Sequence, residues 1–257
     1  MYLGIDIGSI SINAVLVDSQ AKLAAWEIDR SGYDHKASVS RVVERICRRA
    51  SIEPNAMKRV VGTGYGRRNI PLAQETFTEI TCHAVGTRAL FDDVETVIDI
   101  GGQDSKVIRL SPQGKVEDFI MNDKCAAGTG RFLEVMASTM GMDIDTFSRC
   151  GLDSRNPFQI SSTCTVFAES EVVSGIARGI SRKDLVAGIH EAIVRRIGSM
   201  ARSAGASRRV VLTGGVAKSD GIAQRLRGWF SDLRIPEEPQ ITGALGAAIL
   251  GWRHDHG

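Results

Sequence analysis

Short apolar runs separated by turn residues dominate the first third of the chain and predict a strand-rich unit. The second run follows the first after a Gly-Ser turn, which is typical of a hairpin meander. A later stretch repeats its apolar positions at helical spacing. We expect strands at residues 2–8, 12–18, 22–28 and 59–62, and a helix at residues 36–50.

The same series of elements begins again near residue 94. Ile98-Asp99-Ile100-Gly101 repeats Ile5-Asp6-Ile7-Gly8, and two further strand-like runs follow. Recurrence of a whole unit indicates a duplication. We therefore expect an α/β fold of two lobes around a nucleotide cleft, residues 1–93 and 94–257, with the C-terminal helix able to return to the first lobe.

The remainder of the chain has the apolar spacing of helices. Ser181 with Asp184 forms a capping-box pattern at the start of the longest one. A strand at residues 209–213 interrupts the series. The expected helices cover residues 126–140, 143–150, 166–179, 182–204, 215–230 and 243–253.

Composition and charge exclude several classes of protein. The 257 residues carry 32 basic and 30 acidic side chains, so the one-signed field of a nucleic-acid binder is absent. No apolar run approaches the roughly 20 residues that span a bilayer, and the first residues enter a strand without a leader pattern. Five cysteines without CxxC spacing fit a reducing compartment. We expect a cytoplasmic protein with no nucleic-acid or membrane partner.

An aspartate at the end of a buried strand, followed by a glycine turn, occurs twice. Asp6 precedes the first turn and Asp99 the second. Such turns hold phosphate oxygens through backbone N–H groups, while the carboxylates would hold Mg²⁺ through water. One copy is a common hairpin, but two copies in a duplication indicate a nucleotide site. The expected nucleotide-binding residues are Gly8, Ser9, Ile10, Ser11, Ile12, Gly101, Gly102 and Gln103.

A third glycine pair joins a strand to a helix at Gly214-Gly215 and permits close approach of the backbone to a nucleotide. We expect Lys218 and Gln240 to complete this part of the site. Asp104 follows the second turn, where it could orient or deprotonate the attacking water, or only cap the turn. A Rossmann reading of Gly62-Thr-Gly-Tyr-Gly66 lacks the required third glycine, and no P-loop pattern is present.

Two cysteines, Cys125 and Cys164, each stand just ahead of a predicted helix. Backbone N–H groups and the helix dipole favour the thiolate there, which makes these residues candidate metal ligands. The alternative is a small packed thiol, which is our interpretation of Cys47, Cys82 and Cys150. The remaining candidates are given structural roles: His83 and His190 as packing or surface residues, and Glu169 and Glu171 as acidic residues near a helix start.

The three nucleotide motifs, in this order, resemble those of the superfamily of acetate kinase, hexokinase, actin and the heat-shock chaperone ATPases, whose lobes are ribonuclease H-like. Two longer segments narrow the resemblance, Asn122 to Phe132 and Ser161 to Glu171. With them the chain resembles the activators of 2-hydroxyacyl-CoA dehydratases in the BadF/BadG/BcrA/BcrD ATPase family. Further matching motifs are Gly62 to Gly66, Ile98 to Asp104, Thr213 to Ala217 and Gly243 to Ala248.

This resemblance implies a homodimer in which Cys125 and Cys164 of both protomers bind one [4Fe-4S] cluster, with ATP or ADP and Mg²⁺ as the other cofactors. It implies that ATP hydrolysis drives a low-potential electron onto a 2-hydroxyacyl-CoA dehydratase, with flavodoxin or ferredoxin as the donor. The same chemistry could serve a benzoyl-CoA reductase or a double-cubane cluster protein. A small-molecule kinase of the superfamily is the alternative from another class, but it would have no reason to expose the two cysteines. Lys218-Ser219 departs from the family, which often has an amide side chain there.

Overall fold

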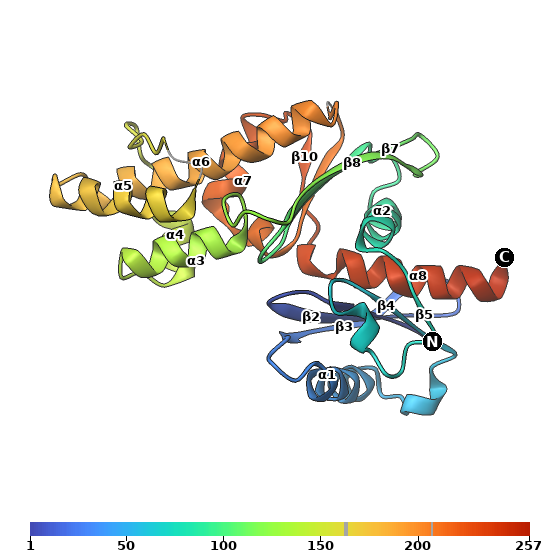
Figure 1. Ribbon diagram of the computed structural model, residues 1–257. Coiled ribbons are helices and arrows are strands. Elements are labelled where there is room, and N and C mark those ends of the chain that lie inside the picture. The colour runs from blue at the N-terminus through green and yellow to red at the C-terminus, as the bar shows by residue number, and fades with distance from the viewer. Residues whose placement is uncertain (162–163, 207) are drawn as a thin grey trace. The chain divides into compact units, whose positions relative to one another are not determined.

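The computed structural model describes residues 1–161, 164–206 and 208–257 (Figure 1). The described chain divides into two compact units, the first formed by Met1–Val97, Leu110–Glu117 and Pro236–Gly257, and the second by Ile98–Arg109 and Asp118–Ile235. The two five-stranded sheets have the orders β3-β2-β1-β4-β5 and β10-β9-β6-β7-β8. If the strands of each sheet are numbered from one to five along the chain, both sheets have the strand order 3-2-1-4-5. The duplicated α/β architecture predicted from the repeat is therefore confirmed.

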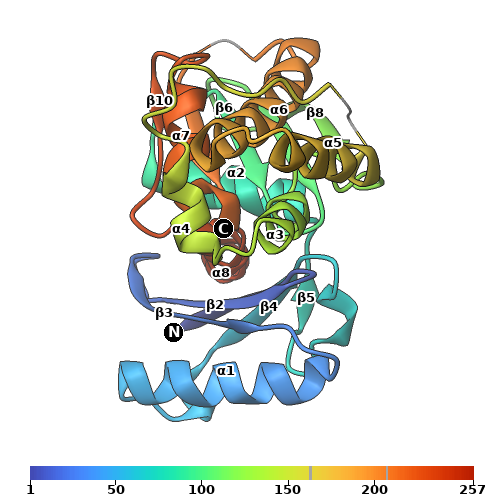
Figure 2. The same cartoon turned by 90° about the vertical axis from the view of Figure 1, so that its left-hand side faces the viewer.

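The first sheet is buried on both faces. Strand β1 (Tyr2–Ile7) is antiparallel to β2 (Ser11–Val17), which is antiparallel to β3 (Leu23–Arg30). On its other side β1 is parallel to β4 (Arg59–Thr63), which is parallel to β5 (Glu75–Thr76). Figures 1 and 2 show helix α1 (His35–Ala50) on one face and α8 (Thr242–His256) on the other.

Alternate residues of β1 serve these two faces, as the two-residue repeat of a strand requires. Leu3, Ile5 and Ile7 join the core that contains the apolar face of α1. Tyr2 joins the separate core that contains Ala244 and Leu245 of α8. Burial on both sides explains why β1 is apolar without alternation.

Helix α2 (Glu79–Leu90) packs against α8 and was not predicted from the sequence. Its buried face consists of small or polar residues, so it lacks the apolar spacing that indicates a helix. Glycines bring the two helices together: a Cβ at Gly86 would collide with the carbonyl of Thr242, and one at Gly246 with the carbonyl of Cys82. The contact requires the absence of side chains at these positions.

The second unit places helices around the longest one, α6 (Arg182–Ser203), whose buried side joins the largest core of the chain. Helix α3 (Gly130–Thr139) contacts α5 (Thr165–Ala177), and α4 (Ile144–Cys150) contacts both α6 and α7 (Asp220–Arg227). The strands of the second sheet are β6 (Thr96–Ile100), β7 (Ser105–Leu110), β8 (Val116–Asn122), β9 (Val210–Thr213) and β10 (Leu233–Arg234). Short 3₁₀ turns are η1 (Pro54–Ala56), η2 (Arg67–Asn69), η3 (Gly215–Lys218) and η4 (Pro239–Ile241).

Two helix predictions were wrong at their boundaries. The helix expected from residue 126 begins only at Gly130, because Gly128 has φ +89° and Thr129 is still extended. The helix expected at residues 215–230 is instead η3 followed by α7, because Ser219 is extended between them. The short strands β5 and β10 were not predicted, since two residues carry no readable periodicity.

His190 of α6 is a buried packing residue, as the sequence analysis expected. Its ring meets the ring of Phe147 edge-on at 5.5 Å between centroids, and a Cβ at Gly221 would collide with its Nδ1. Neither ring nitrogen has a hydrogen-bond partner among the described residues. Burial, with a smaller effect of the Arg225 charge, lowers the pKa of His190 to about 3. The imidazole is therefore neutral in the folded protein at neutral pH.

We expect His190 to make the folded protein sensitive to acid. The unfolded chain takes up a proton near pH 6.5 and the folded chain only near pH 3, so this contribution to stability is complete above pH 6.5 and is lost as the pH falls. Between these values the loss is about 1.4 kcal/mol per pH unit. Urea unfolding from pH 8 to pH 5 should show a smaller pH slope for His190→Leu than for the wild type. Parallel slopes would contradict the assignment.

The α2–α8 contact gives a second prediction. Gly246→Ala places a methyl group against the backbone of Cys82, which a packed helix pair accommodates only by separating. We expect a loss of about 1–3 kcal/mol in the free energy of unfolding. Gly228→Ala is the control, since its Cβ would meet only the carbonyl of Arg225 at 3.2 Å. Equal stability of the two variants in urea unfolding would show that the helices are not in close contact.

Candidate nucleotide and cysteine sites

The first of the two glycine turns that the sequence predicts as phosphate sites, Gly8 to Ile10, lies in the first unit between β1 and β2; we call it the first phosphate turn and its counterpart, Gly101 to Asp104, the second. The N–H of Gly8 donates to the carbonyl of Ser11 at 2.9 Å, and the buried hydroxyl of Ser31 donates to the carbonyl of Gly8 at 2.7 Å. Asp6 is buried beside this turn, at 8% exposure. A Cβ at either Gly64 or Gly243 would collide with its carboxylate oxygens. Glycines on two other elements therefore make room for one carboxylate.

The motif from Gly62 to Gly66 thus has a structural role that the sequence did not assign. The N–H of Gly66 donates to the carbonyl of Ile7 at 2.9 Å, which holds the end of β4 against the end of β1. Gly64 has φ +86°, a conformation that favours glycine. The motif shapes the surroundings of Asp6.

His83 is also brought to this place, although its sequence position showed no carboxylate nearby. It is buried on α2, and its Nδ1 lies 3.1 Å from the hydroxyl of Thr242. A Cβ built on Gly243 would collide with the Asp6 carboxylate and would also lie 3.3 Å from His83 Nε2, so His83 and Asp6 face the same glycine. Only tertiary structure reveals this neighbour of Asp6, because α2 itself was not predicted.

The second phosphate turn lies in the second unit, between β6 and β7. The N–H of Gly101 donates to the carbonyl of Asp104 at 2.9 Å, which closes the turn. Asp99 is 3% exposed, and its Oδ1 accepts from the hydroxyl of Thr213 at 3.0 Å. Lys106 donates to the other oxygen of Asp99 at 3.3 Å and to Asp104 Oδ2 at 2.8 Å. Asp99 is therefore a buried anchor, whereas the Asp104 side chain is 29% exposed and remains accessible.

The third glycine motif joins the same turn. Gly214 has φ +85°, and a Cβ there would collide with the carbonyl of Ile100 at the end of β6. Gly214 accordingly lies beside the second phosphate turn, and Gly215 and Lys218 follow it in η3 within the second unit. Gln240 lies in the first unit, where its N–H donates to Glu238 Oε1 at 3.1 Å.

The segment that carries Cys125 is held by one buried side chain. Asn122 Nδ2 donates to the carbonyls of Cys125 at 2.8 Å and Ala127 at 3.1 Å. Its Oδ1 accepts from Arg196 Nη2 of α6 at 3.2 Å. Cys125 is half-buried and lies five residues before α3, so the prediction that it stands directly at a helix N-terminus was wrong.

The start of α3 is bonded to the second phosphate turn. The N–H of Gly130 donates to the carbonyl of Gly101 at 2.9 Å, and that of Arg131 to the carbonyl of Gly102 at 2.8 Å. The first N–H groups of a helix have no partner within the helix, so the turn satisfies two of them. The second phosphate turn and the segment that carries Cys125 are thereby connected within the second unit.

Cys164 is exposed and is the N-cap residue of α5, as predicted, while Ser162 and Thr163 of the same segment lie outside the described residues. Glu169 and Glu171 have structural partners. Glu169 Oε1 accepts from the hydroxyl of Thr139 at 2.8 Å, which joins α5 to α3, and Glu171 accepts from both the N–H and the hydroxyl of Ser161.

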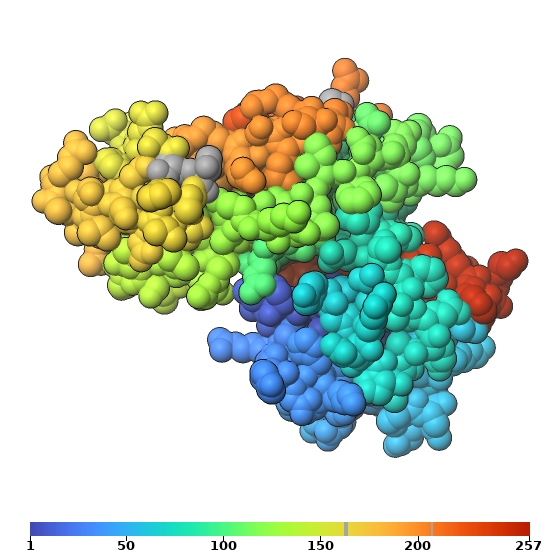
Figure 3. All heavy atoms as spheres, viewed as in Figure 1, coloured from blue at the N-terminus to red at the C-terminus, as the bar shows by residue number. Residues whose placement is uncertain are grey.

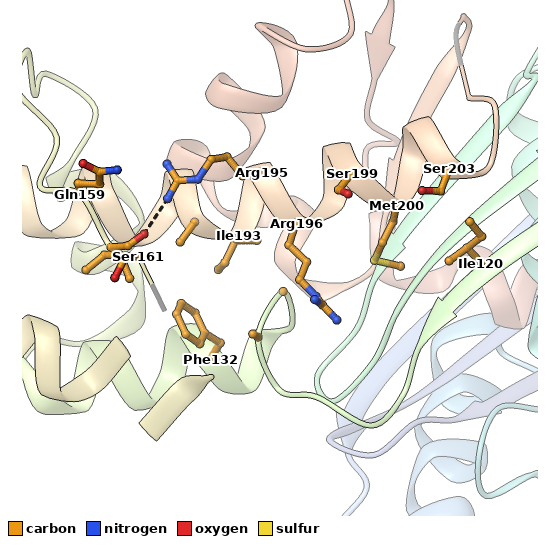
Figure 4. Close-up of a pocket in the computed structure, with 14 residues that line it drawn as sticks. Ile120, Phe132, Gln159, Ser161, Ile193, Arg195, Arg196, Ser199, Met200 and Ser203 are labelled. Atoms are coloured by element: carbon orange, nitrogen blue, oxygen red, sulfur yellow. Dashed lines mark hydrogen bonds between the residues drawn. The ribbon is translucent and has the colours of Figure 1, made fainter. Parts of the chain in front are cut away.

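A cavity of about 630 Å³ lies behind the Cys125 segment in the second unit (Figure 4). Ala127 and Gly128 of the segment form part of its wall, with Phe132 of α3 and Arg196 of α6. In Figure 4 the side chain of Arg196 extends from α6 toward the loop of the segment. The segment therefore borders open space on this side.

The other cysteines are packing residues. Cys47 and Cys82 are buried and Cys150 is half-buried. Burial raises the pKa of the Cys47 thiol and raises that of Cys82 to about 12, which keeps both protonated. In the part of the chain that the structure describes, no three or more His, Cys, Asp or Glu side chains gather as a metal site, and no helix is long and apolar enough to cross a membrane.

Two sheets of the same order, in which the first strand carries an aspartate near its end and is followed by a glycine turn, define the duplicated fold of the actin-like ATPases. A ROK family glucokinase from Streptomyces griseus has the same fold, with a TM-score of 0.56 over 98% of this chain and 99% of that one, at 13% identity. This identity shows the fold alone.

The chain belongs to the BadF/BadG/BcrA/BcrD ATPase family, whose family model matches residues 3–251. It is 42% identical to a 2-hydroxyisocaproyl-CoA dehydratase activator from Clostridioides difficile, over 98% of this chain and 95% of that protein. It is 38% identical to an (R)-2-hydroxyglutaryl-CoA dehydratase activating ATPase from Acidaminococcus fermentans (98% and 96%), and 31% identical to a component of the benzoyl-CoA reductase from Thauera aromatica (98% and 93%).

A solved structure supports the same assignment. The activator of the 2-hydroxyisocaproyl-CoA dehydratase from Clostridium difficile, with bound ADPNP, aligns with a TM-score of 0.94 at 41% identity. The alignment covers 100% of this chain and 96% of that one. The family predicted from the motifs is therefore confirmed.

The Asn122 contacts predict how firmly the Cys125 segment is held. Asn122→Ala removes two donors to the segment, and a loss of about 1.4 kcal/mol in local stability corresponds to about tenfold more frequent opening. In metal-free protein, Cys125 should then be alkylated about tenfold faster, as mapped by mass spectrometry. Asp123→Ala, at an exposed neighbour, is the control and should leave the rate unchanged. An unchanged rate in Asn122→Ala would show that the clamp is unimportant.

Proposed function

We propose that this protein is an ATP-dependent activator that passes a low-potential electron from a [4Fe-4S] cluster to a 2-hydroxyacyl-CoA dehydratase. The observation that carries the proposal is the pair of hydrogen bonds from the start of α3 to Gly101 and Gly102. These bonds join a phosphate turn to a cysteine segment in a chain similar to dehydratase activators over nearly its whole length.

The nucleotide motifs are assigned to ATP and its Mg²⁺. The turns from Gly8 through Ser9, Ile10 and Ser11 to Ile12, and from Gly101 through Gly102 to Gln103, would surround the phosphates. Their phosphate donors would be N–H groups other than those of Gly8 and Gly101, which close the turns. Gly214, Gly215, Lys218 and Gln240 would contact adenosine. Asp6 and Asp99 would hold Mg²⁺ through water, and Asp104, the more accessible carboxylate of its turn, would orient the attacking water. Burial of Asp6 and Asp99 supports fixed orientations for both carboxylates.

The donor set fits a cluster shared by two chains. A cubane takes four thiolates, and we assign two of them to each chain: the exposed Cys164, and the half-buried Cys125, whose segment precedes the helix that is bonded to the second phosphate turn. A homodimer would supply the other pair. The bound cluster would supply one-electron chemistry at low potential. In this chain Asn122 orients the Cys125 segment, and the Glu169 contact fixes α5 relative to α3.

The surface next to Cys164 suits protein contacts. Val166, Phe167, Val173 and Ile176 of α5 are all strongly exposed, and the exposed residues of this helix carry no charge. Figure 3 shows α5, in yellow, at the molecular surface. Uncharged apolar patches of this kind are typical of protein interfaces.

The partner is assigned by similarity. Two of the relatives are named for 2-hydroxyacyl-CoA dehydratases, which favours such an enzyme as the partner. The proposal includes flavodoxin or ferredoxin as the donor and the cytoplasm as the compartment. Benzoyl-CoA reductase is the second candidate, because a relative at 31% identity is a component of that enzyme. A double-cubane protein would use the same chemistry. A kinase of the same fold is disfavoured by the exposed Cys164.

The cluster assignment predicts the iron content. Protein isolated without oxygen should hold about four irons per two chains. Cys125→Ser or Cys164→Ser should abolish the cluster, whereas Cys47→Ser, Cys82→Ser and Cys150→Ser are matched controls that should retain it. Four irons in each chain, or a retained cluster after either of the first two changes, would refute the shared site. Iron analysis, absorbance and chain mass measured together decide between these results.

The nucleotide assignment predicts that ATP turnover can be lost without loss of the cluster iron. Asp6→Asn and Asp99→Asn should lower Mg²⁺-dependent ATP turnover on the order of 100-fold, because the metal that neutralises developing charge is held less well. Iron content should remain unchanged. The exposed Asp92→Asn is the control. Turnover near that of the wild type in both variants would leave the repeated Ile-Asp-Ile-Gly as hairpin structure alone.

A further inference from the structure

Lys106 is an unusual residue for the place it occupies. It lies on β7 between buried strand residues, and it is 2% exposed. A buried ammonium group is costly unless charged or polar groups compensate it. Its Nζ donates to Asp99 at 3.3 Å and to Asp104 at 2.8 Å, so it joins the two carboxylates that bracket the second phosphate turn.

These contacts form a continuous polar chain. The hydroxyl of Thr213, just before the third glycine motif, donates to Asp99, Asp99 accepts from Lys106, and Lys106 donates to Asp104. At the far end, the carbonyl of Asp104 accepts from Gly101. The chain therefore runs from the end of β9, across the end of β6, into the turn.

The charges along this chain are unequal. Two carboxylates and one ammonium group sum to −1. The Asp99 side chain is 5% exposed and the Asp104 side chain is 29% exposed, so Asp104 is the carboxylate of the three groups that reaches solvent. A single negative charge beside phosphate-binding N–H groups attracts a divalent cation while limiting repulsion of the anionic nucleotide.

We propose that Lys106 is a positioning residue of the second phosphate turn. Its ammonium group fixes the Asp104 carboxylate and offsets one of the two negative charges, so Mg²⁺ is attracted by a net charge of −1 rather than −2. This inference rests on the proposed ATP site and names a residue that neither the motifs nor the similarity to relatives assigns. Lys106 acts through Asp104 and Asp99 and does not contact the nucleotide.

Lys106→Met is the direct test. It removes the ammonium group and leaves two carboxylates, so Mg²⁺ should bind more tightly, by about threefold or more. The kcat for ATP should fall about tenfold or more, because Asp104 is no longer held. Lys115→Met, at an exposed position of the β7–β8 hairpin, is the control and should match the wild type. A purely structural role would reduce the folded fraction without moving the Mg²⁺ midpoint per folded site.

Lys106→Arg keeps the charge but alters the reach of the side chain. We expect it to keep the Mg²⁺ midpoint of the wild type and to lower kcat, and this variant decides the matter if Lys106→Met fails to fold. The measurements are ATP turnover over a Mg²⁺ titration, Mg²⁺–ADP binding by calorimetry and circular dichroism. Unaltered Mg²⁺ midpoint and kcat in a folded Lys106→Met, or wild-type kcat in Lys106→Arg, would overturn the inference. If the wild type binds Mg²⁺–ADP but has no turnover, the proposed function fails, while the midpoint still tests Lys106.

Discussion

Two backbone hydrogen bonds connect the parts of this protein to which we assign its chemistry. The first two N–H groups of α3 donate to the carbonyls of Gly101 and Gly102, so the helix begins on the second phosphate turn. In the proposed site, N–H groups of this turn would receive the phosphate, while its carbonyls already accept from the helix. A peptide plane that rotates to receive a phosphate must also move its carbonyl. The geometry therefore gives nucleotide binding a short physical route to Cys125.

Contacts around the Cys125 segment limit how it can respond to rotation of a peptide plane in the second phosphate turn. Asn122 clamps the Cys125 segment from one end, and Glu169 joins α5 to α3. Behind the segment lies the cavity lined by Phe132 and Arg196, so the segment borders open space there. A segment held at its ends beside open space is suited to shift between two arrangements as a body, as switching elements do.

The sequence predicted most strands and the duplication because those features depend on local apolar runs and on a repeat of four residues. It did not predict α2, whose buried face is small and polar and is stabilised by the glycine contact with α8. It placed the start of α3 too early, because the apolar spacing does not reveal the positive φ of Gly128 or the extended backbone of Thr129. Within the candidate site, glycines and aspartates stood out as motifs. Lys106 and His83 did not, since only tertiary contacts identify a polar residue inside an apolar element as a partner.

The central claim is that the nucleotide site and the cysteine segment are energetically coupled, and coupling of this kind is reciprocal. The most direct measurement is an anaerobic redox titration of the cluster, followed by EPR, with and without Mg²⁺ and a non-hydrolysable ATP analogue. The account predicts a shifted reduction potential, where about 59 mV corresponds to a tenfold difference in nucleotide affinity between the two redox states of a one-electron couple. A potential and an EPR spectrum that nucleotide leaves unchanged would contradict the account.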